Sequence, residues 1–269
     1  MALFRKQPSI ENSVKAELRQ IAKQELHLSA NAHKPDPKWK TTIEAKIPQK
    51  VRTTLEAAFV KAFGLIFSHG GGIIDKTTDR ESLMTDHKVR DYAVKLRQSR
   101  GELKKVRKAA DRSDLLSGTL TTFEGIGLGA LGIGLPDIVL FTGMLLRGTY
   151  ECAANYGIDS ETPSERYFIL KLMEAALSKN EAYDTADAEV NALITGNTQF
   201  LPTDDEMAEQ TSRAASAMAL DMLTLKFIQG IPIAGIIGGV SNPVYYNKVM
   251  TYVKLKYYKR YLMGLAESD

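Results

Sequence analysis

Apolar residues recur every three or four positions along most of the chain, which is the spacing of one helix face. This pattern predicts helices in the following ranges: 10–29, 48–67, 79–112, 136–156, 165–178, 181–195, 204–229 and 243–262. The range 79–112 fits either one long polar helix or a pair of helices. No βαβ pattern is present, so we expect an all-α fold built as a single multi-helix domain.

Two glycine-rich apolar segments, 123–146 and 230–243, interrupt this regular pattern. The first has about the length of a membrane-spanning helix, roughly 20 residues. Pro136 and Asp137 stand in its middle, where a proline removes a helix hydrogen bond and a carboxylate is costly to bury. We therefore expect a close-packing glycine-rich helix that ends near Ile133, and an apolar helix that begins at Pro136. Asp137 and the mean hydropathy of −0.19 disfavour insertion into a membrane, although the glycine spacing is one that membrane helices use.

The two glycine-rich segments are predicted to pack centrally, facing each other across a cleft. Asp137 can favour the dipole at the start of its helix, or it can be the buried partner of Arg147, Asn242 or a tyrosine. The residues predicted for this ligand-binding cleft are Gly129, Gly132, Asp137, Arg147, Tyr156, Gly235 and Asn242.

Basic residues are concentrated between Lys88 and Arg112, where ten bases and three acids accompany a thin apolar stripe. Such a helix is either a solvated outer face or a contact with an anionic membrane surface. Nucleic acid is the weaker alternative, because aromatic residues that could stack on bases are scarce there.

The segment 243–262 interleaves tyrosines with lysines and an arginine. Tyrosine has an apolar ring and a polar tip, and lysine can extend its charge into water, so this composition suits a membrane interface. It also suits a helix that lies half-buried on its own domain, and RNA stacking is a third alternative. The residues predicted for a membrane surface are Lys248, Lys254, Lys256, Tyr257, Tyr258, Lys259 and Arg260.

The first predicted helix, 10–29, is amphipathic and is followed by a proline-containing linker, 30–39. It either packs on the domain or stands off as an arm that binds a partner. We therefore divide the chain into an N-terminal helix with its linker, residues 1–39, and a helical domain, residues 40–269.

Net charge, the cysteine count and short motifs limit the kinds of function that the chain can have. The formal net charge of +3 does not by itself indicate nucleic-acid binding. The single cysteine, Cys152, excludes an intrachain disulfide and fits a reducing cytoplasm. The glycines at 127–132 match a dinucleotide-binding string, but no strand precedes them. The four histidines lack metal-site spacing and no nucleophile elbow is present, so we expect no catalytic residue, no metal and no cofactor.

Four stretches, taken in order, carry a resemblance to a known family: Ala45–Val51, Gly72–Thr77, Gly132–Ile138 with Tyr156–Asp159, and Ile231–Asn242. They resemble the EcsC family, bacterial proteins named after the third product of an operon that encodes an ABC transporter. The resemblance covers about residues 45–262 and leaves out the first helix. It implies an all-helical domain that associates with membranes, and it implies no particular biochemical activity.

Together these features lead us to expect a non-enzymatic cytoplasmic protein, peripheral to the inner face of the cell membrane. It would hold a lipid, another apolar ligand or a helix of a membrane protein between the glycine-rich segments. The expected partners are an anionic membrane surface or lipid, with a membrane protein as a further possibility and no nucleic acid. Two alternatives stay open: a regulatory or structural partner of a transporter or secretion complex, and an enzyme that acts on lipids through the Asp137 cluster.

Overall fold

The structure is a computed structural model that describes the following residues: 9–36, 38, 42, 45–69, 79–112, 136–196, 200–228 and 243–267. Every secondary-structure element in these ranges is an α-helix, which confirms the expected all-α fold. The helices are α1 (Ile10–Ala32), α3 (Gln49–His69), α5 (Arg80–Arg97), α6 (Arg100–Asp111), α8 (Pro136–Ala154), α9 (Pro163–Leu177), α10 (Asn180–Thr195), α11 (Asp204–Ile228) and α12 (Pro243–Glu267).

Local capping chemistry sets several of the helix ends. Thr162 caps α9 by accepting a hydrogen bond from the backbone N–H of Glu165, and Pro163 occupies the first turn, where it loses no helix hydrogen bond. The segment 79–112 is a pair of helices rather than one. The chain breaks at Gln98, which has a left-handed φ of 50°, and the Ser99 side chain then caps α6.

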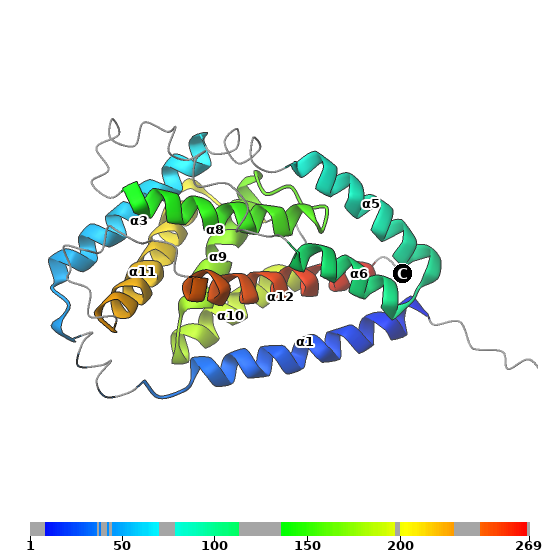
Figure 1. Cartoon of the computed structure of the whole chain (residues 1–269), viewed down its shortest axis with the longest axis horizontal. Helices are drawn as coiled ribbons and strands as arrows, with labels where there is room; N and C mark the ends of the chain where they lie inside the picture. Colours follow the sequence, from blue (N-terminus) through cyan, green and yellow to red (C-terminus); the bar gives the residue numbers. More distant parts are fainter. Residues whose placement is uncertain are drawn as a thin grey trace, which may run out of the picture.

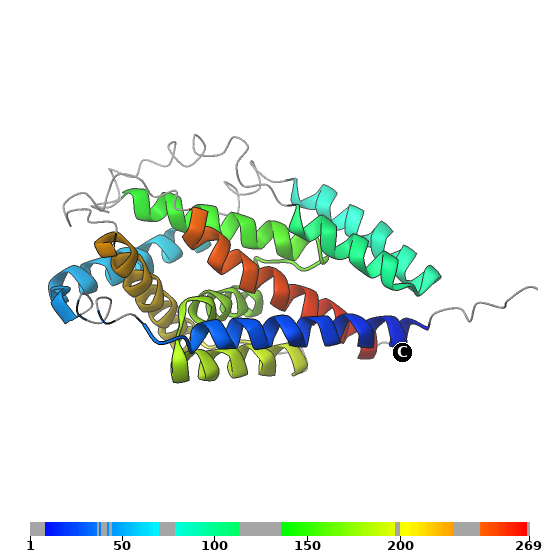
Figure 2. The ribbon, with the colours of Figure 1, turned by 60° about the horizontal axis from the view of Figure 1, so that its bottom comes forward.

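Helix α12 runs through the centre of the fold. It contacts α1, α6, α8, α9 and α10, and both views show it between α8 on one side and α1 on the other (Figures 1 and 2). Tyr252, Tyr257 and Leu262 are among its buried side chains. Neighbours cover most of α12, so it is largely a core helix, and Asn247, Lys248 and Thr251 lie on its exposed side.

The other helices form two groups around this centre. At one end, α11 packs on α3 and α9, and α3 also contacts α8. At the other end, α5 and α6 form a hairpin that packs on α8, and α6 also contacts α1 (Figure 1).

The first helix, α1, packs on the domain. This was one of the two alternatives that the sequence left open for it. Ile10, Val14 and Ile21 lie on its buried face, and the carboxylate of Glu17 is buried beside them. The helix lies along α12 in both views (Figures 1 and 2). The arm alternative is therefore wrong for this conformation.

The turn after α8 depends on a glycine. Gly157 has a φ of +71°, and its N–H donates to the Ala154 carbonyl while the N–H of Ile158 donates to the Ala153 carbonyl. A Cβ at position 157 would lie 2.6 Å from the Cδ2 atom of His87. His87 is buried and donates through Nδ1 to the Asn155 carbonyl at 2.9 Å. Burial lowers the pKa of His87 below its ordinary value, so the ring is held in its neutral form.

Gly157→Ala is expected to lower the free energy of unfolding by about 1–3 kcal/mol, because alanine is strained at positive φ and its Cβ collides with the His87 ring. Gly64→Ala is the matched control. Gly64 lies inside α3 with nothing within 4 Å of an added Cβ, so alanine there should stabilise the protein by about 0.5–1 kcal/mol. Chemical denaturation of both variants measures the difference, and equal effects would show that the turn does not constrain the fold.

Candidate functional site

Most of the predicted ligand cleft falls on residues that the structure does not describe. Gly129, Gly132, Gly235 and Asn242 lie outside the described residues. Asp137 lies in the first turn of α8, and its side chain is also outside the described part. The cleft between the glycine-rich segments therefore stays a prediction.

The two remaining cleft residues, Arg147 and Tyr156, have separate surroundings. Arg147 donates through Nε to Glu151 Oε1 at 2.8 Å, one turn along α8, and both side chains are largely buried. Tyr156 follows α8, and its ring lies 5.7–6.5 Å from the rings of Tyr257, Tyr258 and Tyr261. Burial raises the pKa of Tyr156 well above its ordinary value, so its hydroxyl stays protonated.

The predicted membrane surface on α12 needs a correction. Lys256 and Tyr257 are 0% exposed and Tyr258 is 1% exposed, because α1, α9 and α10 cover them. A side chain that is enclosed by its own domain cannot contact a lipid surface in this conformation. The assignment of these three residues to a membrane surface is therefore wrong, and the alternative of a helix packed on its own domain describes them.

The other predicted basic residues of α12 are less buried, and each bonds to a neighbouring helix. The partners are Asp221 for Lys248 at 2.7 Å, the Asp111 carbonyl for Lys254 at 2.8 Å, Glu25 for Lys259 at 2.9 Å, and Glu165 for Arg260 at 2.6 Å. These contacts join α12 to α11, α6, α1 and α9. They give the four bases a structural role and leave their predicted contact with a membrane untested.

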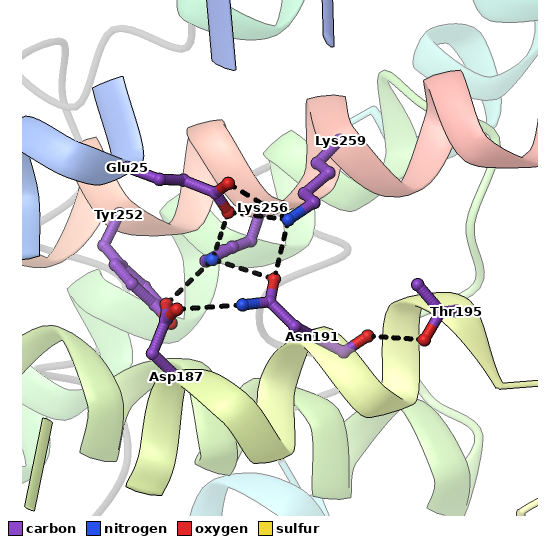
Figure 3. Close-up of polar contacts among 7 residues, drawn as sticks. All are labelled: Glu25, Asp187, Asn191, Thr195, Tyr252, Lys256 and Lys259. Carbon is purple, nitrogen blue, oxygen red and sulfur yellow. Dashed lines mark hydrogen bonds and ion pairs between the residues drawn. The ribbon is translucent and has the colours of Figure 1, made fainter. Parts of the chain in front are cut away.

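A buried polar network around Lys256 connects three helices (Figure 3). The Lys256 ammonium bonds to Glu25 of α1 and, at 2.8 Å and 3.0 Å, to Asp187 and Asn191 of α10. Lys259 reaches the same Glu25 and Asn191. Two carboxylates thus balance two ammonium groups, which offsets the cost of desolvating all four.

In the rest of this network, most N–H and O–H groups of the side chains also donate a hydrogen bond. Tyr252 donates its hydroxyl to Asp187 at 2.6 Å, and Asn191 donates to the other Asp187 oxygen at 2.8 Å. Burial and the Asp187 charge raise the pKa of Tyr252. Thr195, the last labelled residue of Figure 3, donates its hydroxyl to the backbone carbonyls of Asn191 and Ala192. These bonds join α1, α10 and α12, so the network positions the three helices against one another.

Further tyrosines of α12 repeat this pattern with other helices. Tyr257 donates to Glu165 of α9 at 2.5 Å, Tyr258 donates to Glu17 of α1 at 3.1 Å, and Tyr261 donates to Asp91 of α5 at 2.9 Å. Local sequence patterns could not predict these hydrogen-bonded pairs, because each carboxylate lies far from its tyrosine in the sequence, by 92, 241 and 170 positions respectively.

The outward face of α5 belongs to the basic segment 88–112, for which the sequence left open a solvated outer face or a contact with an anionic membrane. Val89, Tyr92 and Leu96 are 66%, 67% and 68% exposed, and their spacing places them on one side of the helix. That side is opposite the buried His87 and Val94. The thin apolar stripe expected between Lys88 and Arg112 is divided by the break between the two helices: Val89 and Leu96 of α5 are exposed, whereas Leu103, Val106 and Ala110 of α6 are buried.

Lysines lie beside this apolar row. We use the name α5 face for Val89, Tyr92 and Leu96 together with Lys88 and Lys95. Lys88 is exposed without an ion pair among the described residues, and Lys95 pairs with Asp91 at its edge. Between Arg80 and Asp111 the hairpin carries ten bases and five acids, so it is more positive than the whole chain with its net +3.

Metal binding and membrane spanning can both be checked against the described part of the chain. Within it, no group of three His, Cys, Asp or Glu side chains is arranged to hold a metal ion. Nor does any of the described helices combine the length and apolarity needed to cross a bilayer. The segment 123–146, for which the sequence disfavours membrane insertion, is described only from residue 136 onward.

A model of the EcsC protein family matches residues 12–262. The match begins inside α1, so our expectation that the first helix lies outside the resemblance is wrong. This agrees with the packing of α1 on α12. Comparison with curated proteins and with solved structures gives no match.

Glu25→Gln is expected to lower the free energy of unfolding by about 2–3 kcal/mol, because it removes one carboxylate from the enclosed Lys256 and also from Lys259. Chemical denaturation measures this loss.

Glu11→Gln is the matched control on the same helix, where Glu11 forms an exposed pair with Lys15. It should leave stability nearly unchanged, because solvent screens such pairs. A similar small effect for both substitutions would contradict a stabilising role for the network.

Proposed function

Because the chain belongs to the EcsC protein family over nearly its whole length, we propose that its helical domain works as one non-enzymatic unit that associates peripherally with an anionic membrane. The α5 face is the surface that meets the lipid. In this proposal the membrane is the inner face of the cell membrane, as the sequence led us to expect.

The observation that carries this proposal is the exposed apolar row of Val89, Tyr92 and Leu96 beside Lys88 and Lys95. An interfacial helix combines an apolar face, which enters the boundary between head groups and acyl chains, with basic residues that attract anionic lipid. Tyrosine is favoured at this depth because its ring is apolar and its hydroxyl stays hydrated.

Approximate energies indicate reversible binding. Each large apolar side chain gains about 1.5–3 kcal/mol when it is fully buried, and partial burial gains less. A lysine near an anionic surface adds about 1 kcal/mol, and salt screens this contribution. Three apolar residues and two lysines therefore support a salt-sensitive, peripheral association.

The test is co-sedimentation of the full chain with vesicles of phosphatidylcholine alone or mixed with phosphatidylglycerol. The triple variant Val89→Ser, Tyr92→Ser, Leu96→Ser should reduce binding to the mixed vesicles by at least about tenfold, because it removes the buried apolar area. The pair Lys88→Gln, Lys95→Gln should weaken binding at low salt and have little effect at high salt.

Lys50→Gln with Lys61→Gln is the matched control, since both lysines are exposed on α3 and neither has an ion pair among the described residues. This control should bind like the wild type. The proposal fails if the wild type does not bind mixed vesicles, or if the triple variant binds them as well as the wild type does.

A further inference from the structure

A groove of about 400 Å³ lies between α1, α6 and α12. Its charged and polar lining includes Lys23 and His27 of α1, Arg107 and Asp111 of α6, and Thr251 and Lys254 of α12. The volume is within the usual range for small-molecule sites. The groove is separate from the α5 face and from the network around Lys256.

The lining carries an excess of positive charge. Lys23, Arg107 and Lys254 stand against one carboxylate, Asp111, whose Oδ2 atom is 3.8 Å from Arg107 Nε. Lys23 is exposed and has no ion pair in the described ranges. The carboxyl end of α6, which carries partial negative charge, also faces this region. Lys254 offsets that charge by donating to the Asp111 carbonyl at 2.8 Å.

Arg107 is held in place before any ligand arrives. Its guanidinium lies over the Tyr258 ring, with the carbon 5.2 Å from the ring centre, and one Nη2 hydrogen goes to Gln24 at 3.1 Å. Tyr258 is itself fixed by its bond to Glu17. A guanidinium presents five donors in a rigid fork, so further N–H groups remain for a ligand. This geometry matches the oxygens of phosphate.

We propose that this groove binds a small phosphate-bearing anion, through Arg107 and Lys23. His27 and Thr251 are exposed at its edge and can hydrogen-bond the non-phosphate part of the ligand. Leu28 and Leu255 supply an apolar wall. The phosphate belongs either to a soluble metabolite or to a lipid head group, and both sources present the same chemistry to the groove.

The test is calorimetry of the full chain with pyrophosphate and with glycerol 3-phosphate, in the absence of vesicles. Lys23→Gln should weaken binding about tenfold, the loss of one charge-assisted contact. Thr251→Trp should abolish binding, because it fills the groove and leaves every charge in place. Arg107→Gln should also abolish binding, and its melting temperature separates loss of the site from loss of the fold.

The control pair Lys50→Gln, Lys61→Gln removes two positive charges from α3, one more than either groove variant, and should bind like the wild type. A second arm compares vesicles that contain phosphatidic acid with vesicles that contain phosphatidylglycerol at equal surface charge. Binding of the soluble probes supports a soluble ligand. Preference for phosphatidic acid that Thr251→Trp removes supports a lipid head group.

The proposal is overturned if neither arm detects binding that depends on the groove, or if Thr251→Trp and a folded Arg107→Gln bind like the wild type. The calorimetric arm contains no membrane, and the α5 triple variant should bind the soluble probes normally. Failure of the groove is therefore distinguishable from failure of membrane binding by α5.

Discussion

The need to pair polar side chains inside the protein, along α12, is the constraint on which the rest of the structure depends. A core helix that carries lysines and tyrosines is stable only if the surrounding helices supply partners for its buried polar groups. Glu25 of α1, Asp187 of α10, Glu165 of α9 and Asp91 of α5 supply them. Each of these bonds fixes the position of one helix against α12, so the same contacts that satisfy its polar groups also define the arrangement of the domain.

This use of α12 decides which surfaces are left for binding. Most of its charged groups form contacts within the domain, and four of its six tyrosine side chains are buried. The hairpin of α5 and α6 differs, because it turns an apolar row and exposed lysines away from the core. Arg107 connects the two parts of the molecule, since it belongs to the hairpin and stacks on Tyr258 of α12. A basic groove thereby forms beside α12, although the lysines of α12 themselves bond to neighbouring helices.

The sequence predicts the helices well, since periodicity and caps are local signals. The start of α9 at Thr162 and Pro163 and the start of α8 at Pro136 are examples. It could not predict the role of α12, because tyrosines mixed with lysines suit a membrane interface and a polar core equally. The choice depends on distant partners such as Glu25, 231 positions from Lys256. The sequence places one apolar stripe along the basic segment 88–112, but the break at Gln98 separates the faces of α5 and α6, so this stripe becomes an exposed row on α5 and a buried face on α6. The predicted cleft residues Gly129 and Asn242 lie outside the described part of the chain.

The central claim is that α5 meets lipid while α12 stays within the domain. Cys152 is buried and burial raises the pKa of its thiol, so a cysteine introduced elsewhere can be labelled selectively. The most direct measurement attaches an environment-sensitive fluorophore to Leu96→Cys on α5 or to Asn247→Cys, an exposed position on α12, and adds vesicles with brominated acyl chains. We expect the lipid to quench the probe at position 96 and to leave the probe at position 247 unchanged. Quenching at position 247 without quenching at position 96 would contradict the claim and would place α12, not α5, at the membrane.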